Sequence, residues 1–123
     1  MILGLGTDLV EIARIQRVRD RHGERFERRI LTDAEFREYR ERDGCVAYLA
    51  KRFAVKEAVA KALGTGMRGS VQWSTIQVLS GDLGRPECCL LGEAANFTQG
   101  KKVSVTITDE RAYALAFAIY HTE

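Results

Sequence analysis

The chain has 123 residues, 46% of them hydrophobic, which is enough for one folded domain and argues against two domains or a disordered chain. Nineteen Lys and Arg against seventeen Asp and Glu leave a formal net charge of +2, so attraction to an anionic partner must come from local patches. No apolar run reaches the roughly 20 residues that span a bilayer, and the start of the chain lacks a signal-peptide pattern. We therefore expect a single domain over residues 1–123 of a cytoplasmic protein with no membrane partner.

The reactive side chains exclude several kinds of catalysis. Cys45, Cys88 and Cys89 fit neither a spaced disulfide framework nor a C-x-x-C metal pair, so we expect reduced thiols. His22 and His121 lie outside the zinc-hydrolase patterns, and no serine lies in G-x-S-x-G. A Walker motif and a G-x-G-x-x-G motif are also absent. Zinc hydrolysis, triad chemistry and the common nucleotide folds therefore lack their parts.

The first third of the chain predicts a strand and two helices. The apolar run over residues 2–8 is compatible with a buried strand and gives way at once to a helical pattern. From Glu11 to about His22, apolar residues recur at helical spacing between charged ones, which predicts an amphipathic surface helix. Thr32 followed by Glu35 is a capping-box pattern, and it starts a polar helix that ends near Gly44.

The most clearly marked helix covers residues 46–63, which hold no Gly or Pro and are rich in Ala, Leu, Lys and Glu; Gly64 supplies the stop. The rest of the chain predicts a turn over residues 81–86, a brief helix over 92–97 and several short strands. These strands are 74–79, 87–91 and a hairpin of 102–108 with 113–120, joined through Asp109, Glu110 and Arg111. The predicted fold class is α+β, a largely antiparallel sheet packed against one long helix and shorter helices.

Glu57 occupies a costly position on the long helix. On a helical wheel it falls on the centre line of the apolar stripe, with Lys61 beside it. Burying a carboxylate there without a partner costs on the order of several kcal/mol. Two interpretations stay open: an i,i+4 ion pair between Glu57 and Lys61, or a carboxylate that holds a cation.

Asp8 raises the same question on the first strand. Alternation places Gly4, Gly6 and Asp8 on one side, where two missing side chains leave room beside the carboxylate. The glycines serve either the close approach of a ligand or packing against another backbone. Asp8 itself is either the N-cap of the following helix or a metal ligand. Together with Glu57 and substrate phosphates, it would supply the oxygen ligands that Mg²⁺ prefers.

Cationic groups accompany this predicted pair of carboxylates. Arg52, Lys56 and Lys61 lie around the long helix, and the backbone of residues 64–66 is either a phosphate-binding loop or a helix C-cap. A basic ridge follows the first helix and its extension, where seven Arg face three acids across residues 14–29. Its regularly spaced members are Arg14, Arg17, Arg21 and Arg25. Such a ridge is either a solvated face or a docking surface for an acidic macromolecule.

Three segments together resemble holo-acyl-carrier-protein synthase, the small bacterial group of the 4′-phosphopantetheinyl transferases. They are GLGTDLVEI over 4–12, RFAVKEA over 52–58 followed by KALGTG over 61–66, and GRP over 84–86. The resemblance runs in order through nearly the whole chain. The combination of G-x-D near the start with F-x-x-K-E-x-x-x-K is highly specific, although each fragment alone is weak.

The resemblance implies that the 4′-phosphopantetheine arm of coenzyme A is transferred to a serine of acyl carrier protein, as in fatty acid biosynthesis, with Mg²⁺ required and 3′,5′-ADP released. It assigns the metal to Asp8 and Glu57 and a phosphate contact to Lys61, and these three form the expected catalytic set. Glu57 is our candidate for the base, acting directly or through a water. The expected coenzyme-binding residues are Arg52, Lys56, Gly64, Thr65, Gly66 and Pro86.

The resemblance further implies a homotrimer with its sites at subunit junctions, and contacts from Arg14 and Arg21 to the acidic carrier protein. Many members carry a His where this chain reads Thr108-Asp109-Glu110, so no imidazole role is carried over. Two other functions compete with the transferase. A nucleic-acid-binding module would need aromatic residues spread along the basic ridge, and none is evident. A non-catalytic scaffold would bind acidic proteins without turnover.

Overall fold

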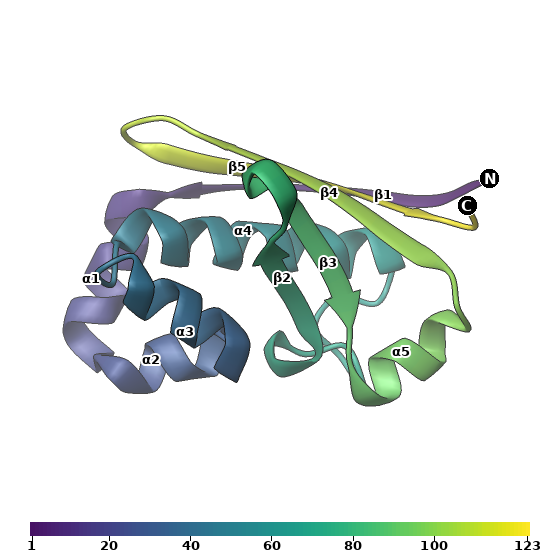
Figure 1. Cartoon of the computed structure of the whole chain (residues 1–123), viewed down its shortest axis with the longest axis horizontal. Coiled ribbons are helices and arrows are strands. Elements are labelled where there is room, and N and C mark those ends of the chain that lie inside the picture. The colour runs from purple at the N-terminus through teal and green to yellow at the C-terminus, as the bar shows by residue number, and fades with distance from the viewer.

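The computed structural model describes all residues 1–123 as five α-helices and two antiparallel sheets (Figure 1). In chain order the elements are β1 (Ile2–Glu11), α1 (Ile12–His22), α2 (Glu24–Ile30), α3 (Asp33–Glu41), α4 (Val46–Leu63), the 3₁₀ turn η1 (Trp73–Thr75), β2 (Ile76–Ser80), the 3₁₀ turn η2 (Asp82–Gly84), β3 (Pro86–Leu90), α5 (Gly92–Thr98), β4 (Lys102–Asp109) and β5 (Tyr113–His121). One sheet has the order β1-β5-β4, and β2 pairs only with β3. The predicted α+β class and antiparallel pairing are confirmed.

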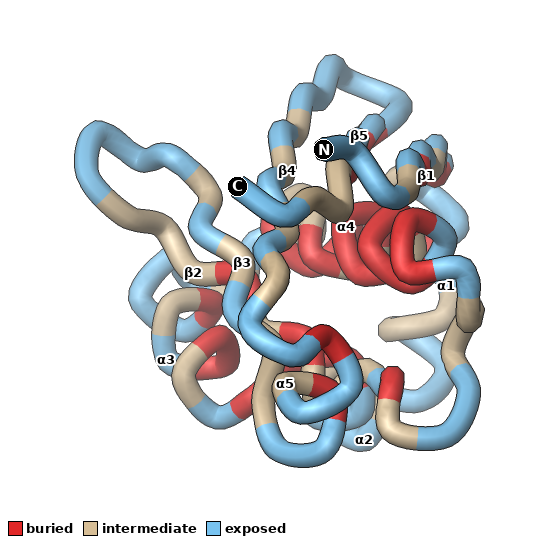
Figure 2. The backbone as a smooth tube through the Cα atoms, turned by 90° about the vertical axis from the view of Figure 1, so that its right-hand side faces the viewer, coloured by how far each residue is buried: buried red, intermediate tan, exposed pale blue.

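Helix α4 lies against one face of the three-stranded sheet and forms the centre of the core (Figures 1 and 2). Small residues make this close approach possible. The inward face of β5 carries alanines at 114, 116 and 118, and all three are buried. A Cβ at Gly4 or Gly6 would overlap the carbonyl oxygens of Ala62 or Ala58 on α4. The two glycines of β1 therefore serve backbone packing, which was one of the two predicted alternatives.

The predicted elements are confirmed, with differences of one to three residues at several boundaries; the predicted buried strand, β1, is covered only on its inward face. The long helix spans Val46–Leu63, and its C-cap Gly64 has the left-handed φ of 81° that glycine adopts without strain. Strand β1 continues past residue 8 to Glu11, because its partner β5 is long enough to pair with it through Tyr113. The 74–79 and 87–91 strands are displaced by one or two residues, and the brief helix is confirmed as α5.

The amino-terminal helices pack at one end of α4 (Figure 1). Helix α3 begins with the predicted capping box between Thr32 and Glu35. The basic ridge does not follow one continuous helix, however. Gly23 has φ 63° and ψ −144°, so α1 ends at His22 and a separate helix α2 carries Arg25. The chain termini lie close together at the other end, where the Thr122 amide donates to the Met1 carbonyl.

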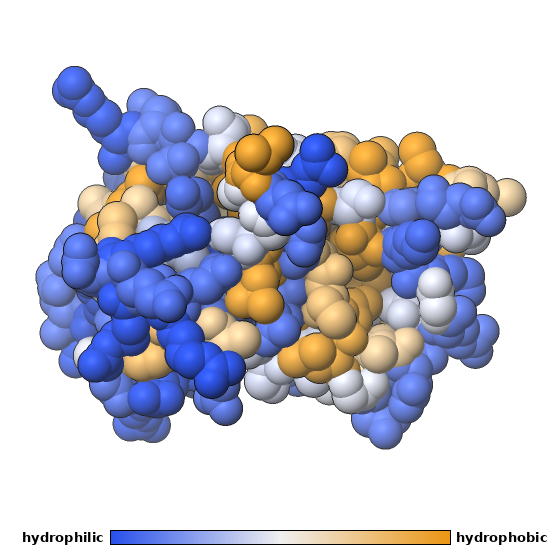
Figure 3. Space-filling model, in the orientation of Figure 1, coloured by the Kyte–Doolittle hydropathy of each residue, from blue (hydrophilic) through white to orange (hydrophobic).

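The outer face of the three-stranded sheet is apolar and exposed. Its side chains from β1 and β5 are Leu3, Leu5, Leu9, Tyr113, Leu115 and Phe117, which keep between 38% and 61% of their surface exposed. Figure 3 shows hydrophobic residues gathered along the upper right edge, over this sheet, and a hydrophilic surface at the left, over the amino-terminal helices. No helix in the structure is both long and apolar enough to cross a membrane.

Candidate functional site

Asp8, Glu57 and Lys61 come together where β1 crosses α4. Asp8 points from the inward face of the strand, opposite Ala116 of β5, because alternation puts it on the same side as Gly4 and Gly6. Lys61 Nζ donates to Asp8 Oδ1 at 3.1 Å and to the Thr7 carbonyl at 2.9 Å. Asp8 is 18% exposed and Lys61 53% exposed, so the ion pair lies at the surface.

Glu57 lies within electrostatic reach of Asp8. Partial burial raises the pKa of Glu57, and the charge of Asp8 raises that pKa further, while Lys61 and Arg14 oppose both effects. A half-buried carboxylate that lies close to a second negative charge gains from a bound cation. The convergence of Asp8 and Glu57 is therefore present within one chain.

The structure rejects the simpler alternatives for both acids. Helix α1 has Glu11 as its N-cap, without a side-chain hydrogen bond, so Asp8 is not a cap. No ion pair joins Glu57 to Lys61, because the ammonium group of Lys61 turns to Asp8. Glu57 is thus a half-buried carboxylate that forms no salt bridge within the chain.

The donor set fits Mg²⁺ better than a transition metal. No group of three or more His, Cys, Asp and Glu side chains is placed to hold a metal ion by itself. Asp8 and Glu57 offer only hard carboxylate oxygens, and Mg²⁺ is commonly held by one or two carboxylates together with substrate phosphates and water. The site accordingly suits a metal whose remaining ligands arrive with the substrate.

Arg52 and Pro86 belong to a different face of the protomer. Arg52 is 4% exposed; its Nε donates to the Val78 carbonyl at 2.7 Å and its Nη2 to Glu38 at 3.3 Å. The same guanidinium contacts Ser80, the residue that pairs with Pro86 across the β2–β3 hairpin. The predicted residues therefore form two groups within one chain. One group lies beside β1, and the other lies next to the turn of the β2–β3 hairpin.

Lys56 lies in the core, not at the surface of the helix. It is fully buried, and its ammonium group donates to the Ile30 carbonyl, Glu35 Oε1 and the Trp73 carbonyl. These three bonds use every donor of the group, so none is left for coenzyme A. Residue spacing could not reveal this, because Glu35 and Trp73 are distant in the sequence.

The loop over residues 64–66 is first of all a helix cap. The amide of Gly64 donates to the Lys61 carbonyl at 3.0 Å, and that of Gly66 to the Ala60 carbonyl at 3.2 Å. Of the three amides, those two are used to end α4. A cavity of about 400 Å³ opens beside the loop, lined by Gly64, Thr65, Arg68, Gly69, Ser70, Val71 and Phe97. The loop thus caps the helix and borders an open pocket, and its role in coenzyme binding stays a prediction.

The structure adds a cavity beside the basic ridge that sequence patterns did not reveal. It measures about 430 Å³ and lies between α1, α2, α4 and η1, lined by Val18, His22, Arg25, Phe26, Arg29, Ile30, Phe53 and Trp73. Phe53 and Trp73 stack with their ring centroids 5.0 Å apart. From the sequence no aromatic residues were evident along the ridge, but the fold places Phe26, Phe53 and Trp73 beside it. We call this feature the docking cavity below.

The ridge arginines differ in their contacts. Arg14 and Arg21 are exposed, and Arg14 lies near enough to Glu57 to influence its pKa. Arg17 pairs with Glu11 at 3.4 Å. Arg19 instead faces inward, where it donates to the Tyr39 hydroxyl and to the Gly44 carbonyl. Arg14 and Arg21 thus form no salt bridge within the chain, while Arg25 and Arg29 line the docking cavity.

Known proteins resemble this chain over nearly its whole length. Residues 4–118 match the model of the 4′-phosphopantetheinyl transferase superfamily. The holo-[acyl-carrier-protein] synthase of Pectobacterium carotovorum is 50% identical over 121 residues, with 96% of both chains covered. The crystal structure of the synthase from Neisseria meningitidis has a TM-score of 0.93 at 42% identity and covers 98% of this chain and 99% of its own.

A third similar protein was solved with a ligand. The holo-(acyl-carrier-protein) synthase from Bacillus anthracis, in complex with CoA (3′,5′-ADP), has a TM-score of 0.84 at 30% identity, and the match covers 100% of this chain and 99% of that one. The resemblance stated from the motifs is thereby confirmed over the full fold. The chain belongs to the 4′-phosphopantetheinyl transferase superfamily, in its group of holo-[acyl-carrier-protein] synthases, and is an enzyme of that class.

Proposed function

We propose that this protein transfers the 4′-phosphopantetheine group of coenzyme A to a serine hydroxyl of an apo acyl carrier protein, with Mg²⁺ required and 3′,5′-ADP released. The similar synthases support the substrates. The observation that carries the proposal within this chain is the meeting of Asp8, Glu57 and Lys61 on α4 and β1.

The reaction needs positioning and charge neutralisation more than covalent catalysis. The serine oxygen attacks the phosphorus that carries the pantetheine, and the bond from that phosphorus to the bridging oxygen of the pyrophosphate breaks. The bridging oxygen leaves with 3′,5′-ADP. Lys61, half exposed beside Asp8, is placed to neutralise charge on the phosphates. Glu57 accepts the serine proton directly or through a water, and its raised pKa suits a base.

Asp8 and Glu57 would hold the Mg²⁺ ion with oxygens of the pyrophosphate. When bound there, the ion would neutralise the negative charge that develops on the phosphate oxygens, and it would orient the pyrophosphate. The repulsion between the two carboxylates, visible in the raised pKa of Glu57, would then be offset by the bound cation. Lys61 keeps Asp8 in place until the substrate arrives, because its ammonium group bridges Asp8 and the β1 backbone.

The second group of predicted residues supports a site shared between copies. Arg85 and Pro86 lie at the turn of the β2–β3 hairpin, and Arg52 reaches this hairpin from α4 through its bonds to Val78 and Ser80. We propose a homotrimer in which the hairpin of one protomer completes the Asp8 and Glu57 site of the next. The exposed apolar face of the sheet is the surface available for such an assembly.

The basic ridge and the docking cavity are the proposed carrier-protein surface. Arg14 and Arg21 would attract acidic side chains, and the apolar floor formed by Phe26, Phe53 and Trp73 would take an apolar side chain of the carrier protein. Because Arg14 lies near Glu57, docking on the ridge would bring the serine toward the carboxylates.

Mass spectrometry of apo acyl carrier protein incubated with the enzyme, coenzyme A and Mg²⁺ tests the proposal. We expect the carrier protein to gain the mass of the phosphopantetheine arm. Asp8→Asn and Glu57→Gln should each slow this transfer by about 100-fold or more while the circular dichroism spectrum stays unchanged. A wild-type enzyme that never modifies the carrier protein, or either variant turning over normally, would contradict the proposal.

A further inference from the structure

The ammonium group of Lys56 is fully enclosed and holds three separate parts of the chain. It donates to the carbonyl of Ile30 at the end of α2 at 2.6 Å, to Glu35 Oε1 on α3 at 2.7 Å and to the carbonyl of Trp73 in η1 at 2.8 Å. Lys56 and Glu35 both have no exposed side-chain surface. A buried ammonium group with three acceptors is satisfied, whereas the same carbonyls without it would be left unpaired.

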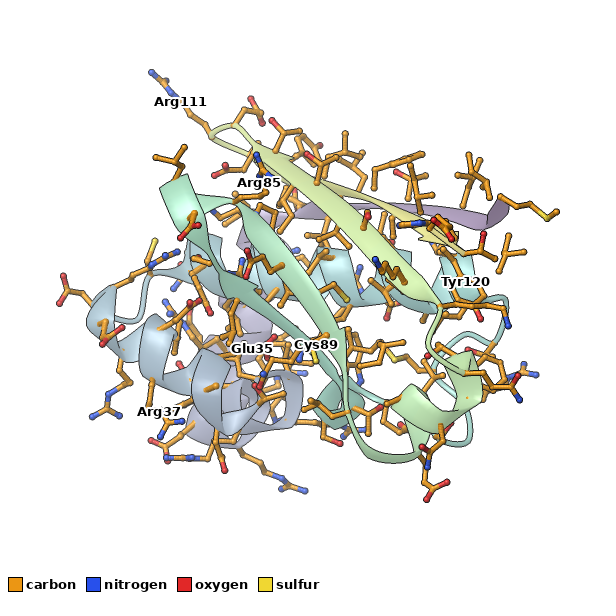
Figure 4. The ribbon with its side chains drawn as sticks, turned by 45° about the vertical axis from the view of Figure 1, so that its right-hand side comes forward. Glu35, Arg37, Arg85, Cys89, Arg111 and Tyr120 are labelled. Carbon is orange, nitrogen blue, oxygen red and sulfur yellow. The ribbon has the colours of Figure 1, made fainter.

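Glu35 completes the same network from the other side. Its Oε1 also accepts from the Thr32 amide at 2.8 Å, and its Oε2 accepts from the Val78 amide of β2 at 2.7 Å. Figure 4 shows Glu35 within the body of the molecule, while Arg37 on the same helix points away from it. One ion pair therefore ties α2, α3, η1 and β2 to helix α4.

Two of the groups that Lys56 holds are walls of the docking cavity. Ile30 and Trp73 line that cavity, and Trp73 stacks on Phe53, which lies on α4 one turn before Lys56. The residue after Lys56 is Glu57. The side chains of these neighbours point in different directions on the helix, so one lies in the core and the other at the site. Lys56 thus fixes the cavity walls relative to the carboxylate.

A simple stabilising role does not require an ion pair at this position. Well-packed apolar residues often replace a buried ion pair without loss of stability, so such a pair is weak evidence for stability alone. The bonds of Lys56 to the carbonyls of Ile30 and Trp73 fix the positions of these two segments relative to α4. Packing of side chains alone would allow the segments to shift. The carbonyls belong to segments that would otherwise meet only through side chains.

We propose that Lys56, together with Glu35, is a positioning residue for carrier-protein docking: it sets the walls of the docking cavity in register with Glu57 and does not touch coenzyme A. This inference rests on the proposed function for the identity of the docked partner. The arrangement itself stands on the hydrogen bonds and the cavity.

The test removes both charges together. Lys56→Met alone leaves a buried carboxylate unpaired and is expected to unfold much of the protein. Lys56→Met with Glu35→Gln keeps the side-chain volumes and an acceptor for the Val78 amide. For this double variant we expect the KM for apo carrier protein to rise about tenfold. The KM for coenzyme A and kcat should stay within about twofold, in steady-state assays below the melting temperature.

The matched control removes a buried hydrogen-bonding group on the same helix that has no role at the site. Tyr48→Phe deletes the hydroxyl that bonds to Glu38 and to the Glu35 carbonyl but to no wall of the docking cavity. We expect its KM for carrier protein to be unchanged. Lys56→Gln in the Glu35→Gln background restores donors to the carbonyls and should recover part of the lost affinity. It also serves as the test protein if the methionine variant does not fold.

Trp73 gives a readout that does not depend on turnover, because it is the only tryptophan of the chain. We expect its emission to shift to the red in the methionine double variant, since the walls around it loosen. A rise in the KM for coenzyme A alone, or unchanged KM values and unchanged emission in a folded variant, would overturn the inference. A wild-type chain that shows no transfer while the emission still shifts would instead overturn the proposed function and leave the positioning role supported.

Discussion

Glu57 is a single residue whose predicted function lowers the stability of the folded protein. Burial and the charge of Asp8 raise its pKa above the ordinary value, so the folded protein binds this proton more tightly than the unfolded chain. The free energy of unfolding therefore falls as pH rises from the ordinary pKa to the raised one. At neutral pH and without metal, the ionised Glu57 therefore lowers the free energy of unfolding.

Glu57→Gln should accordingly stabilise the metal-free protein at pH 7 and not at pH 4. We expect a higher melting temperature by on the order of 1 °C at pH 7, because Glu57 remains partly exposed to solvent. Near pH 4 the difference should shrink toward zero, since the carboxyl group is then protonated in both states. Scanning calorimetry in a chelating buffer measures both. A variant less stable than the wild type at pH 7, or a difference independent of pH, would contradict this account.

The sequence singled out the residues of the candidate site but not their surroundings. Asp8 and Glu57 stood out because carboxylates were placed where apolar residues cost less, and both proved to lie together. Lys56 could not be placed correctly, because a helical wheel gives the direction of a side chain and not what packs against it. Its partner Glu35 lies 21 residues away. Reading that partnership required the tertiary structure.

Helix α4 and strand β1 form the site because their backbones approach closely. Gly4 and Gly6 leave space for the carbonyls of Ala62 and Ala58 on the helix, and this contact brings Asp8 to Lys61. The distance between strand and helix is thus set by residues that have no chemical role. A larger residue at either glycine would push the two functional elements apart.

Gly6→Ala should destabilise the protein by roughly 3 kcal/mol and reduce transfer even where the protein is still folded. The new Cβ would collide with the backbone of α4, which cannot move without disturbing the core. Gly81→Ala is the matched control, because the atoms near its Cβ belong to the flexible end of the Glu87 side chain. Urea unfolding monitored by circular dichroism compares the two. Equal stabilities would show that close packing of β1 does not set the site.

The elements themselves were largely predictable from local signals. The capping box at Thr32 and the left-handed glycine at 64 marked helix ends that the structure reproduces. The break at Gly23 was missed, because the arginine spacing runs through it as if one helix continued. The extra length of β1 was also missed, since it comes from pairing with β5 and not from its own composition.

At the scale of the whole molecule, the charges are divided unevenly even though the net charge is only +2. The hydrophilic end of the molecule carries the helices with the arginine ridge, and the apolar sheet lies along its upper edge (Figure 3). An uneven distribution of this kind steers an acidic partner by a field that salt screens within about 10 Å. We therefore expect the arginine ridge to bind the carrier protein and the apolar sheet face to bind other copies of the chain.

Arg21→Glu should raise the KM for carrier protein by about tenfold and flatten its dependence on salt, with the KM for coenzyme A unchanged. Arg14→Glu should affect both catalysis and docking, because its charge reaches Glu57. Lys102→Glu is the control, since this exposed lysine pairs across from His121 near the chain termini, at the end of the molecule opposite to the amino-terminal helices. Steady-state kinetics at 50 and 300 mM salt measure these effects. Equal losses for the two substrates in Arg21→Glu would contradict the assignment of the ridge.

Leu5→Asp should dissociate the proposed trimer, because it places a charge in the middle of the apolar sheet face, where Leu5 is 57% exposed. Phe97→Asp is the control, since Phe97 is 48% exposed on α5, outside both that sheet face and the β2–β3 hairpin. Sedimentation equilibrium should give three protomers for the wild type and for Phe97→Asp, and one for Leu5→Asp. A monomeric wild type would contradict the shared site.

The most direct test of a cation held between Asp8 and Glu57 is calorimetric titration of Mg²⁺ into the enzyme with coenzyme A present. The account predicts one Mg²⁺ bound per protomer with coenzyme A and much weaker binding without it, because the pyrophosphate supplies the missing ligands. Asp8→Asn and Glu57→Gln should each weaken that binding by about tenfold or more while coenzyme A still binds. Unchanged Mg²⁺ affinity in both variants would contradict the central claim.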